Sequence, residues 1–235
     1  MSIPRFLINK NDKDILSKEE IHHLQKVLRL KVKDKIIVFN GEGEEMLIEI
    51  LNFKPYFEYT IIENKFTEKK SPYIKLILAT IKPKNLELIL EKVTELGVDE
   101  IIITKTKYSQ INLNILEEKK VRLEKILVEA CKQSGNNYIP KLKFVEINDI
   151  KNILADKNYL ATTQYTKNPI ILSMDINKTK EESYSLFVGP EGGFESEEYA
   201  YLSKYFEPVK FSHNILRVET ASILGIGILV QLKMK

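Results

Sequence analysis

The stretch IKLILATIKPKNLELILEKVTELGVDEIIIT, residues 74–104, carries the pattern that most clearly indicates the fold of this chain. It opens on an apolar run at 74–81, which is typical of a strand buried on both faces of a sheet. Apolar residues then recur at helical spacing up to residue 96, and Gly97 is a suitable helix stop. A second apolar run at 100–104 predicts another strand. This order predicts two parallel strands joined by a crossover helix.

The same alternation continues to the end of the chain. Further strands are predicted at 142–145, 159–163 and 184–189, and further helices at 117–133, 195–205 and 220–232. Strands that alternate with helices favour a parallel sheet covered on both faces. We therefore predict an α/β fold for this part of the chain.

The first seventy or so residues follow a different pattern. Short runs rich in Ile, Val, Phe and Tyr predict strands at 3–8, 35–39, 46–51 and 57–62. One helix interrupts them, and Ser17 with Glu20 three residues later forms a capping-box pattern at its start. Several short strands with one helix predict a small β-barrel-like module.

Composition limits the class of protein. The chain has 235 residues, of which 43% are hydrophobic, and a net charge of only +3, which permits nucleic-acid binding without arguing for it. No apolar run is long enough to span a bilayer and no signal peptide is expected, which favours a cytoplasmic protein. The single cysteine, Cys131, lies on an apolar helical stripe and is interpreted as a buried hydrophobe. Without paired cysteines or a spaced histidine cluster, we expect no metal site.

The loop GPEGGF at 189–194 is the first candidate for chemistry. Ligands of open parallel sheets bind beyond the carboxyl ends of the strands, and this loop follows a predicted strand. Its glycines allow a close backbone approach, and the helix that it is expected to open would offer N–H groups to an anion. The alternative is a tight turn that carries a surface glutamate, Glu191.

The segment SHNILRVETA at 212–221 is the second candidate. It contains Arg217, one of only four arginines among the 36 basic residues, with Glu219 two residues later and Thr220 as a possible helix cap. Arg217 either binds a ligand through its guanidinium or forms a local ion pair that holds the loop. The final helix is apolar almost all round, which fits a dimer interface and a deep monomer core equally well.

Basic residues gather at 26–35 and, with Arg5, His22 and His23, could contact phosphates. Lys82 and Lys84 could extend this strip. The alternative for the whole set is an ordinary solvated surface.

A series of motifs in a specific order resembles one known family. The motifs are IPRF at 3–6, HHLQKVLRL at 22–30, FNGEG at 39–43, EKVTELGV at 91–98, EACKQSG at 129–135, GPEGGF at 189–194 and ILRVETA at 215–221. Together they resemble the RsmE-type 16S ribosomal RNA uridine-N3 methyltransferases of the SPOUT superfamily, nearly from end to end.

The resemblance implies two domains. Residues 1–70 would form a PUA-like β-barrel RNA-binding domain, and residues 73–235 a SPOUT methyltransferase domain with a parallel sheet and a deep trefoil knot. It also implies a homodimer, S-adenosyl-L-methionine as the methyl donor, no metal, and 16S rRNA or the small ribosomal subunit as the partner.

The resemblance also implies roles for individual residues. Arg217 would stabilise the anionic uracil, and Glu191 or Glu219 would take or relay the N3 proton. The donor would be held by Thr162, Thr163, Gly189, Pro190, Glu191, Gly193, Ile215, Leu216, Thr220 and Ala221. RNA would be held by Arg5, His23, Lys26, Arg29, Lys82 and Lys84.

Three positions depart from the family pattern, which usually has arginine where this chain has Asn136 and Asn214, and glycine where it has Ser212. These departures put some phosphate or substrate contacts in question, and two alternative functions also stay open. One is a SPOUT methyltransferase that acts on another RNA or position, and the other is a non-catalytic RNA-binding module.

Overall fold

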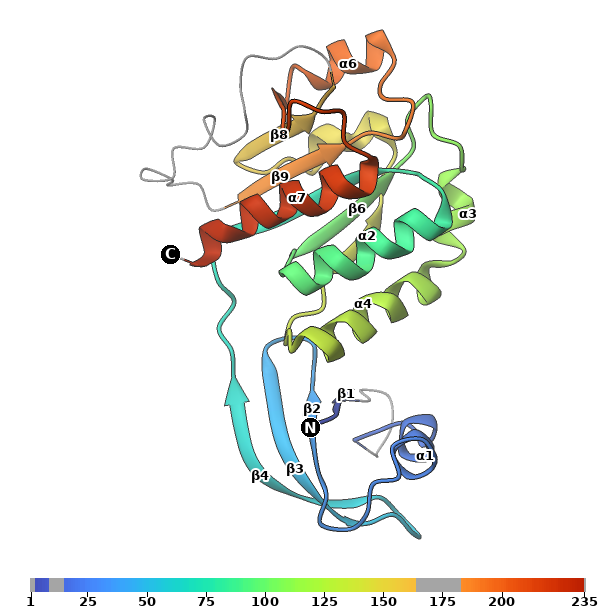
Figure 1. Cartoon of the computed structure of the whole chain (residues 1–235), viewed down its shortest axis with the longest axis vertical. Helices are drawn as coiled ribbons and strands as arrows, with labels where there is room; N and C mark the ends of the chain where they lie inside the picture. The colour runs from blue at the N-terminus through green and yellow to red at the C-terminus, as the bar shows by residue number, and fades with distance from the viewer. Residues whose placement is uncertain (1–2, 9–14, 164–182, 235) are drawn as a thin grey trace. The chain divides into compact units, whose positions relative to one another are not determined.

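The computed structural model describes residues 3–8, 15–163 and 183–234 of the chain (Figure 1). Contacts divide the chain into two compact units. Unit 1 contains Met1–Lys69 and Val128–Ile139, and unit 2 contains Lys70–Leu127 and Pro140–Lys235. Each unit has its own hydrophobic core, so each is described by itself.

Unit 1 is built on one four-stranded sheet. The strands are, in spatial order, β1 (Arg5–Leu7), β2 (Lys35–Phe39), β3 (Glu44–Asn52) and β4 (Glu58–Phe66). β1 runs parallel to β2, and the other neighbours are antiparallel. Helix α1 (Lys18–Lys26) begins after Ser17, and the predicted capping box with Glu20 is confirmed. Leu24 of α1 packs into the core formed mainly by Phe6, Leu16, Ile36, Val38, Ile48, Ile50 and Phe57.

Residues 128–139 belong to unit 1 by their contacts, although the sequence pattern assigned them to the second domain. The Arg5 guanidinium donates to the Asn137 side-chain oxygen, and the Asn137 amide donates to the Thr67 hydroxyl at 3.0 Å. The Tyr138 hydroxyl donates to the Thr67 carbonyl at 2.7 Å. These partners are distant in sequence, so no local pattern indicates them.

Unit 2 contains a six-stranded sheet in the order β10-β8-β9-β5-β6-β7, with every neighbouring pair parallel. The strands are β5 (Tyr73–Ala79), β6 (Glu100–Thr104), β7 (Lys141–Phe144), β8 (Lys157–Ala161), β9 (Ser183–Val188) and β10 (Glu207–Val209). The predicted α/β class with a parallel sheet is thereby confirmed. The edge strand β10 was not predicted, because it has only three residues and contains Pro208.

Helices α2 (Pro83–Leu96) and α7 (Val218–Val230) lie side by side on one face of this sheet (Figure 1). Gly97 ends α2 with a φ of 94°, a left-handed conformation that suits glycine. On the opposite face, Ile77, Ile102, Leu160 and Phe187 of the sheet pack against residues of the 3₁₀ helix η1 (Ile147–Asn152) and helix α6 (Ser196–Leu202). The sheet is therefore covered on both faces, as its apolar strands require.

The remaining helical segments are α3 (Leu113–Glu117), α4 (Lys120–Ser134) and η2 (Gln231–Met234). The predicted helix at 117–133 corresponds to α4, and α3 is a separate short helix that the periodicity did not indicate. Within the described residues, no helix combines the length and the apolar character needed to cross a membrane.

Candidate functional site

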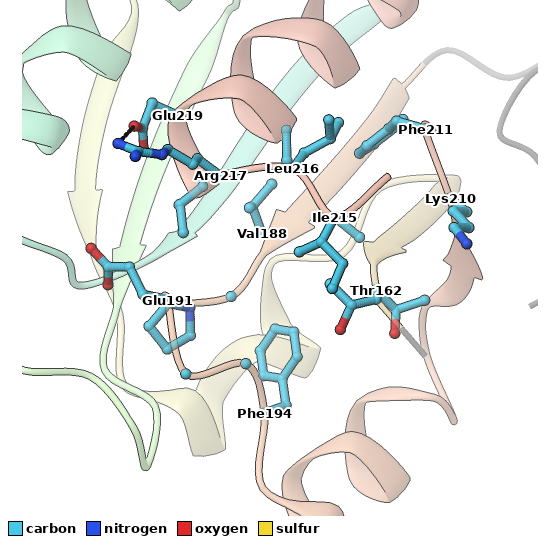
Figure 2. A pocket seen from close by; sticks show the side chains of 18 of the residues that line it. Thr162, Val188, Glu191, Phe194, Lys210, Phe211, Ile215, Leu216, Arg217 and Glu219 are labelled. Carbon is cyan, nitrogen blue, oxygen red and sulfur yellow. Dashed lines mark ion pairs between the residues drawn. The ribbon is translucent and has the colours of Figure 1, made fainter. Parts of the chain in front are cut away.

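A cavity of about 750 Å³ lies at the carboxyl edge of the sheet in unit 2 (Figure 2). Parallel strands all end at the same edge, so the segments that follow β8, β9 and β10 meet there. The starts of α2 and α7 complete the wall. The lining comprises Lys82, Asn85, Ala161–Thr163, Val188–Phe194, Tyr199, Lys210–Ser212, Asn214–Glu219 and Ala221.

The loop 189–194 presents mostly backbone to this cavity. The Gly193 N–H donates to the Pro190 carbonyl at 2.9 Å and closes a tight turn, and Gly193 has a φ of 72°. A Cβ on Gly189 would lie 2.9 Å from the ring of Phe194, which leaves no room for a side chain. The Phe194 ring in turn packs edge-on against the buried Phe187 at 5.2 Å between centroids. The loop is therefore both a tight turn and part of the cavity wall.

Helix α6 does not offer the anion site that was expected after this loop. It begins at Ser196, and the Glu195 N–H donates to the side chain of Glu198 at 3.2 Å. A carboxylate of the chain thus already occupies the start of this helix. A strand followed by glycines and a helix does not reveal which residue caps the helix, so the sequence did not indicate this capping box.

Residues after β8 and β10 form the opposite side of the cavity. The Thr162 N–H donates to the Val209 carbonyl at 3.1 Å and joins the ends of the two strands. Figure 2 shows Thr162, Lys210 and Phe211 on this side, across from Glu191 and Arg217.

Arg217 and Glu219 form a weak ion pair at the start of α7. Arg217 is the N-cap residue, with extended backbone at φ −66° and ψ 158°, and Glu219 lies in the first turn. Their side-chain nitrogen and oxygen are 3.9 Å apart, and the Arg217 side chain is 86% exposed whereas that of Glu219 is 18% exposed. An exposed pair at this distance contributes little to stability, so an incoming anionic group can replace Glu219 as the arginine's partner.

Thr220 does not cap the final helix, which corrects the sequence-based expectation. Helix α7 begins two residues earlier, at Val218, so Thr220 lies inside its first turn. Thr220 is also not among the residues that line the cavity, whereas Ala221 is.

The structure brings most of the predicted site residues to this one cavity. They are Lys82, Thr162, Thr163, Gly189, Pro190, Glu191, Gly193, Ile215, Leu216, Arg217, Glu219 and Ala221. Sequence reasoning missed Asn85, Phe194, Tyr199, Lys210 and Phe211. Lys210 and Phe211 directly follow β10, so recognition of that strand would have indicated them.

The predicted RNA contacts of unit 1 divide into two groups. His23, Lys26 and Arg29 are exposed. Arg5 is not a surface residue, because its side chain is only 10% exposed, its guanidinium pairs with Glu45, and it lies over the Phe39 ring at 5.0 Å. We interpret a largely enclosed arginine that is already paired as a structural residue.

Cys131 is fully buried, in agreement with its interpretation as a core residue. Burial raises the pKa of its thiol to about 12, with the Arg5 charge acting in the opposite direction. Among the residues that the structure describes, no group of three or more His, Cys, Asp or Glu side chains could hold a metal ion.

Comparisons with known proteins agree with this architecture. The family model of an RNA methyltransferase domain matches residues 68–230, and that of an RNA methyltransferase PUA domain matches residues 16–54. The ribosomal RNA small subunit methyltransferase E 2 of Borreliella burgdorferi is 32% identical over 212 residues, which cover 88% of this chain and 86% of the relative. The ribosomal RNA small subunit methyltransferase E of Buchnera aphidicola subsp. Schizaphis graminum is 31% identical over 231 residues, which cover 94% of this chain and 92% of the relative.

Solved structures share the fold over almost the whole chain. A Legionella pneumophila protein described as a methyltransferase, with the bound cofactor SAM, has a TM-score of 0.83 and 26% identity, and the match covers 97% of each chain. A ribosomal RNA small subunit methyltransferase E from Neisseria gonorrhoeae, bound to S-adenosyl methionine, has a TM-score of 0.84 and 22% identity over 98% of each chain.

The RNA methyltransferase model covers the parallel-sheet domain with the cavity at its strand ends, and the PUA model covers residues of unit 1. Together they define an RNA methyltransferase with a PUA domain. The particular family follows from the relatives that match most of the chain. This chain belongs to the ribosomal RNA small subunit methyltransferase E family.

Proposed function

We propose that this protein transfers the methyl group of S-adenosylmethionine to N3 of a uridine in the 16S rRNA of the small ribosomal subunit. The observation that carries the proposal is the cavity at the carboxyl edge of the sheet, lined by the loop 189–194, Arg217 and Glu219. Family membership supports the reaction class, and the resemblance of the motifs supports the uridine N3 position.

The donor is proposed to lie among Thr162, Thr163, Gly189, Pro190, Glu191, Gly193, Ile215, Leu216 and Ala221. A cavity of about 750 Å³ is within the usual range for small-molecule sites. The Phe194 ring packs against the Gly189 backbone, so one wall of the cavity combines peptide groups with an aromatic ring. This combination suits a nucleoside that carries both an amino acid and a flat base. Thr220 is left out, because it does not line the cavity.

The chemical step needs three contributions from the protein. The N3 lone pair of the uracil forms a bond to the methyl carbon while the carbon–sulfur bond breaks, so the two groups must be held in line. The N3 proton must leave, and the negative charge that develops on O2 and O4 must be stabilised.

Side chains on one side of the cavity suit these tasks. Figure 2 shows Glu191 on the same side as the Arg217–Glu219 pair. Arg217 is proposed to donate to a carbonyl oxygen of the uracil, because its guanidinium is exposed and only weakly paired. Glu191 or Glu219 is proposed to accept the N3 proton, directly or through water.

RNA binding is proposed to use exposed basic side chains of both units. Within unit 1 these are His23, Lys26 and Arg29, and within unit 2 they are Lys82 and Lys84. Lys82 also lines the cavity, so it could hold a phosphate next to the target nucleotide. The target base must be turned out of the folded RNA to reach the donor.

A homodimer in the cytoplasm and a trefoil knot in unit 2 belong to the same proposal. Helix α7 buries Val218, Ser222, Gly225, Ile226 and Leu229, yet it leaves Leu224 exposed. This apolar side chain could be covered by a second copy. Light scattering coupled to size-exclusion chromatography tests the dimer, and a mass of 27.3 kDa at micromolar concentration would contradict it.

The decisive experiment incubates the protein with small ribosomal subunits or naked 16S rRNA and labelled S-adenosylmethionine, and then maps the methyl group by nuclease digestion and mass spectrometry. We expect one 3-methyluridine in 16S rRNA. A methyl group on a ribose oxygen or on another RNA would instead identify a methyltransferase of different specificity. No transfer, together with no rise in melting temperature on addition of the donor, would favour a non-catalytic RNA-binding module.

A further inference from the structure

Tyr108 is an exposed aromatic residue that packs against the loop 189–194. The residue is 48% exposed. A Cβ built on Gly192 would lie 3.0 Å from the Cβ of Tyr108 and 3.5 Å from its Cγ. The Cβ end of the Tyr108 side chain therefore packs closely on the Gly192 backbone, beside Glu191, and a larger residue at position 192 would push Tyr108 away by a few tenths of an ångström.

The backbone around Tyr108 is held in place by several hydrogen bonds. The Ser109 N–H donates to the Thr106 carbonyl at 3.1 Å, and the Thr106 N–H donates to the Ser109 hydroxyl at 3.1 Å. The Lys107 N–H donates to a side-chain oxygen of Glu198 at 2.6 Å. Tyr108 therefore projects from a fixed turn.

Glu198 connects this turn to the cavity loop. Its other carboxylate oxygen accepts from the Glu195 N–H, which directly follows the loop 189–194. The Glu198 carboxylate thus binds both the turn at 106–109 and the end of the loop 189–194. The fold therefore fixes the position of Tyr108 relative to Glu191 and Gly192.

The exposed ring has no evident structural purpose. A tyrosine used for packing is normally buried, with its hydroxyl hydrogen-bonded. Within residues 3–8, 15–163 and 183–234, the Tyr108 hydroxyl makes no hydrogen bond. By contrast, Phe194 is anchored against Phe187 and Gly189.

We propose that Tyr108 is the stacking surface for the uracil that is turned out of the RNA. The inference rests on the proposed function, because it assumes a flipped base next to Glu191. A base that has left its neighbours loses their stacking, and proteins that bind unstacked bases replace it with an aromatic ring. Tyr108 offers such a ring beside Glu191, on a rigid turn.

The test compares Tyr108→Phe with Tyr108→Leu in methyl transfer to small ribosomal subunits. Stacking requires the ring and not the hydroxyl, so Tyr108→Phe should keep kcat/KM within about twofold of wild type. Tyr108→Leu should lower kcat/KM by about 10- to 100-fold, which is the usual worth of one aromatic–base stack. Affinity for the donor, measured by calorimetry without RNA, should stay unchanged in both variants.

Tyr205→Leu is the matched control, because Tyr205 is also a partly exposed tyrosine of unit 2, at 37%, but its ring packs against Tyr201 of helix α6. It should leave transfer unchanged. If Tyr108→Leu transfers methyl as fast as wild type, the stacking role is rejected while the proposed function stands. If wild type itself transfers no methyl to any RNA, the proposed function fails, and the inference fails with it.

Photo-crosslinking adds a readout that a purely structural role would not affect. A 16S rRNA fragment carrying 5-iodouridine at the mapped position is irradiated with wild-type protein, and the attached residue is identified by mass spectrometry. The expected attachment is at Tyr108, and it should persist on phenylalanine in Tyr108→Phe. Attachment only to Phe194, Tyr199 or Phe211 would overturn the inference.

Discussion

Arg217 and Arg5 are two of the four arginines in the chain, and the structure places them in opposite surroundings. Arg217 is almost fully exposed at the rim of the cavity, whereas Arg5 is enclosed between Glu45, Asn137 and the Phe39 ring. Arginine is therefore an exposed residue beside the cavity in unit 2 and an enclosed, paired residue in unit 1. At the scale of single residues, exposure and partners decide the role.

Replacement of Arg217 by alanine separates catalysis from folding. Because the side chain is exposed and its ion pair is weak, Arg217→Ala should keep the melting temperature and the donor affinity of wild type. Loss of the group that stabilises the developing charge should lower kcat by about 100-fold or more. Single-turnover transfer to small subunits measures this, and near-normal turnover would remove Arg217 from the chemical step.

Cys131 makes stability depend on pH in the alkaline range. Burial raises the pKa of the folded-state thiol from 9.0 to about 12, so the folded protein keeps a proton that the unfolded chain loses. The associated stability is fully present below pH 9 and is lost as the pH rises towards 12. Relative to Cys131→Ala, wild type should therefore lose about 1 kcal/mol of unfolding free energy between pH 8 and pH 10.

Urea unfolding of wild type and Cys131→Ala at the two pH values measures this difference. The alanine variant cancels the contribution of all other groups that titrate in this range. A difference that stays constant from pH 8 to pH 10 would show that the thiol is not protected by burial.

At the scale of single elements, one segment contains strained backbone and another is held to the core by a buried ion pair. The segment between α1 and β2 carries two non-glycine residues with positive φ, Arg29 at 55° and Lys33 at 75°. At the other end of the chain, Lys233 of η2 pairs with the buried Asp99 and donates to the Gly97 carbonyl at 2.9 Å. Asp99 in turn accepts from the Ile74 N–H at 2.7 Å, so η2 is tied to β5.

Lys33→Gly should stabilise the protein, because a left-handed conformation costs a residue with a Cβ about 1–2 kcal/mol. The greater freedom of glycine in the unfolded chain offsets part of this, which leaves a gain of about 0.5–1 kcal/mol. The Lys33 N–H bond to the Ile50 carbonyl is kept. Lys31→Gly in the same loop is the control, because Lys31 is not at positive φ, and it should not stabilise.

Both variants are compared with wild type by thermal unfolding. A melting temperature of Lys33→Gly at or below that of Lys31→Gly would contradict the assignment of strain to Lys33.

Lys233→Met should destabilise the protein by about 3 kcal/mol, because it leaves the buried Asp99 carboxylate without its cation. Methionine keeps most of the apolar part of the lysine side chain, so the lost stability measures the contribution of the Lys233 charge. Lys204→Met, at an exposed lysine, is the control and should change stability by less than about 0.5 kcal/mol. Chemical denaturation at pH 7 measures both, and equal effects would show that the buried pair contributes no special stability.

At the scale of the whole molecule, the two proposed tasks fall on two separately packed units. Every residue of the cavity lies in unit 2, whereas His23, Lys26 and Arg29 lie in unit 1. Donor binding and the unit 1 contribution to RNA binding should therefore be separable by mutation.

Arg29→Ala tests this separation. It should weaken binding of 16S rRNA and make the affinity less dependent on salt, because one phosphate contact fewer releases about one counterion less. Donor affinity, measured without RNA, should be unchanged. Filter binding over a range of KCl concentrations gives the salt slope, and a slope equal to that of wild type would assign Arg29 to the ordinary solvated surface.

The helices, the strands and the α/β class could be predicted from the sequence, because apolar periodicity and caps act over a few residues. The run at 74–104 predicted β5, α2 and β6, and Ser17 with Glu20 predicted the start of α1. The glycine loop 189–194 and the segment around Arg217 were found for the same reason, since each follows or precedes a strongly patterned element.

Which residues contact one another could be learned only from the three-dimensional structure. The burial of Arg5, the assignment of 128–139 to unit 1 and the entry of Lys210 into the cavity all depend on partners distant in sequence. The contact of Tyr108 with Gly192 likewise joins residues distant in sequence, because Tyr108 lies between β6 and α3 and Gly192 lies between β9 and α6. The contacts around the cavity form because parallel strands bring their carboxyl ends to one edge of the sheet, and the pattern of a short segment does not show which other segments end there.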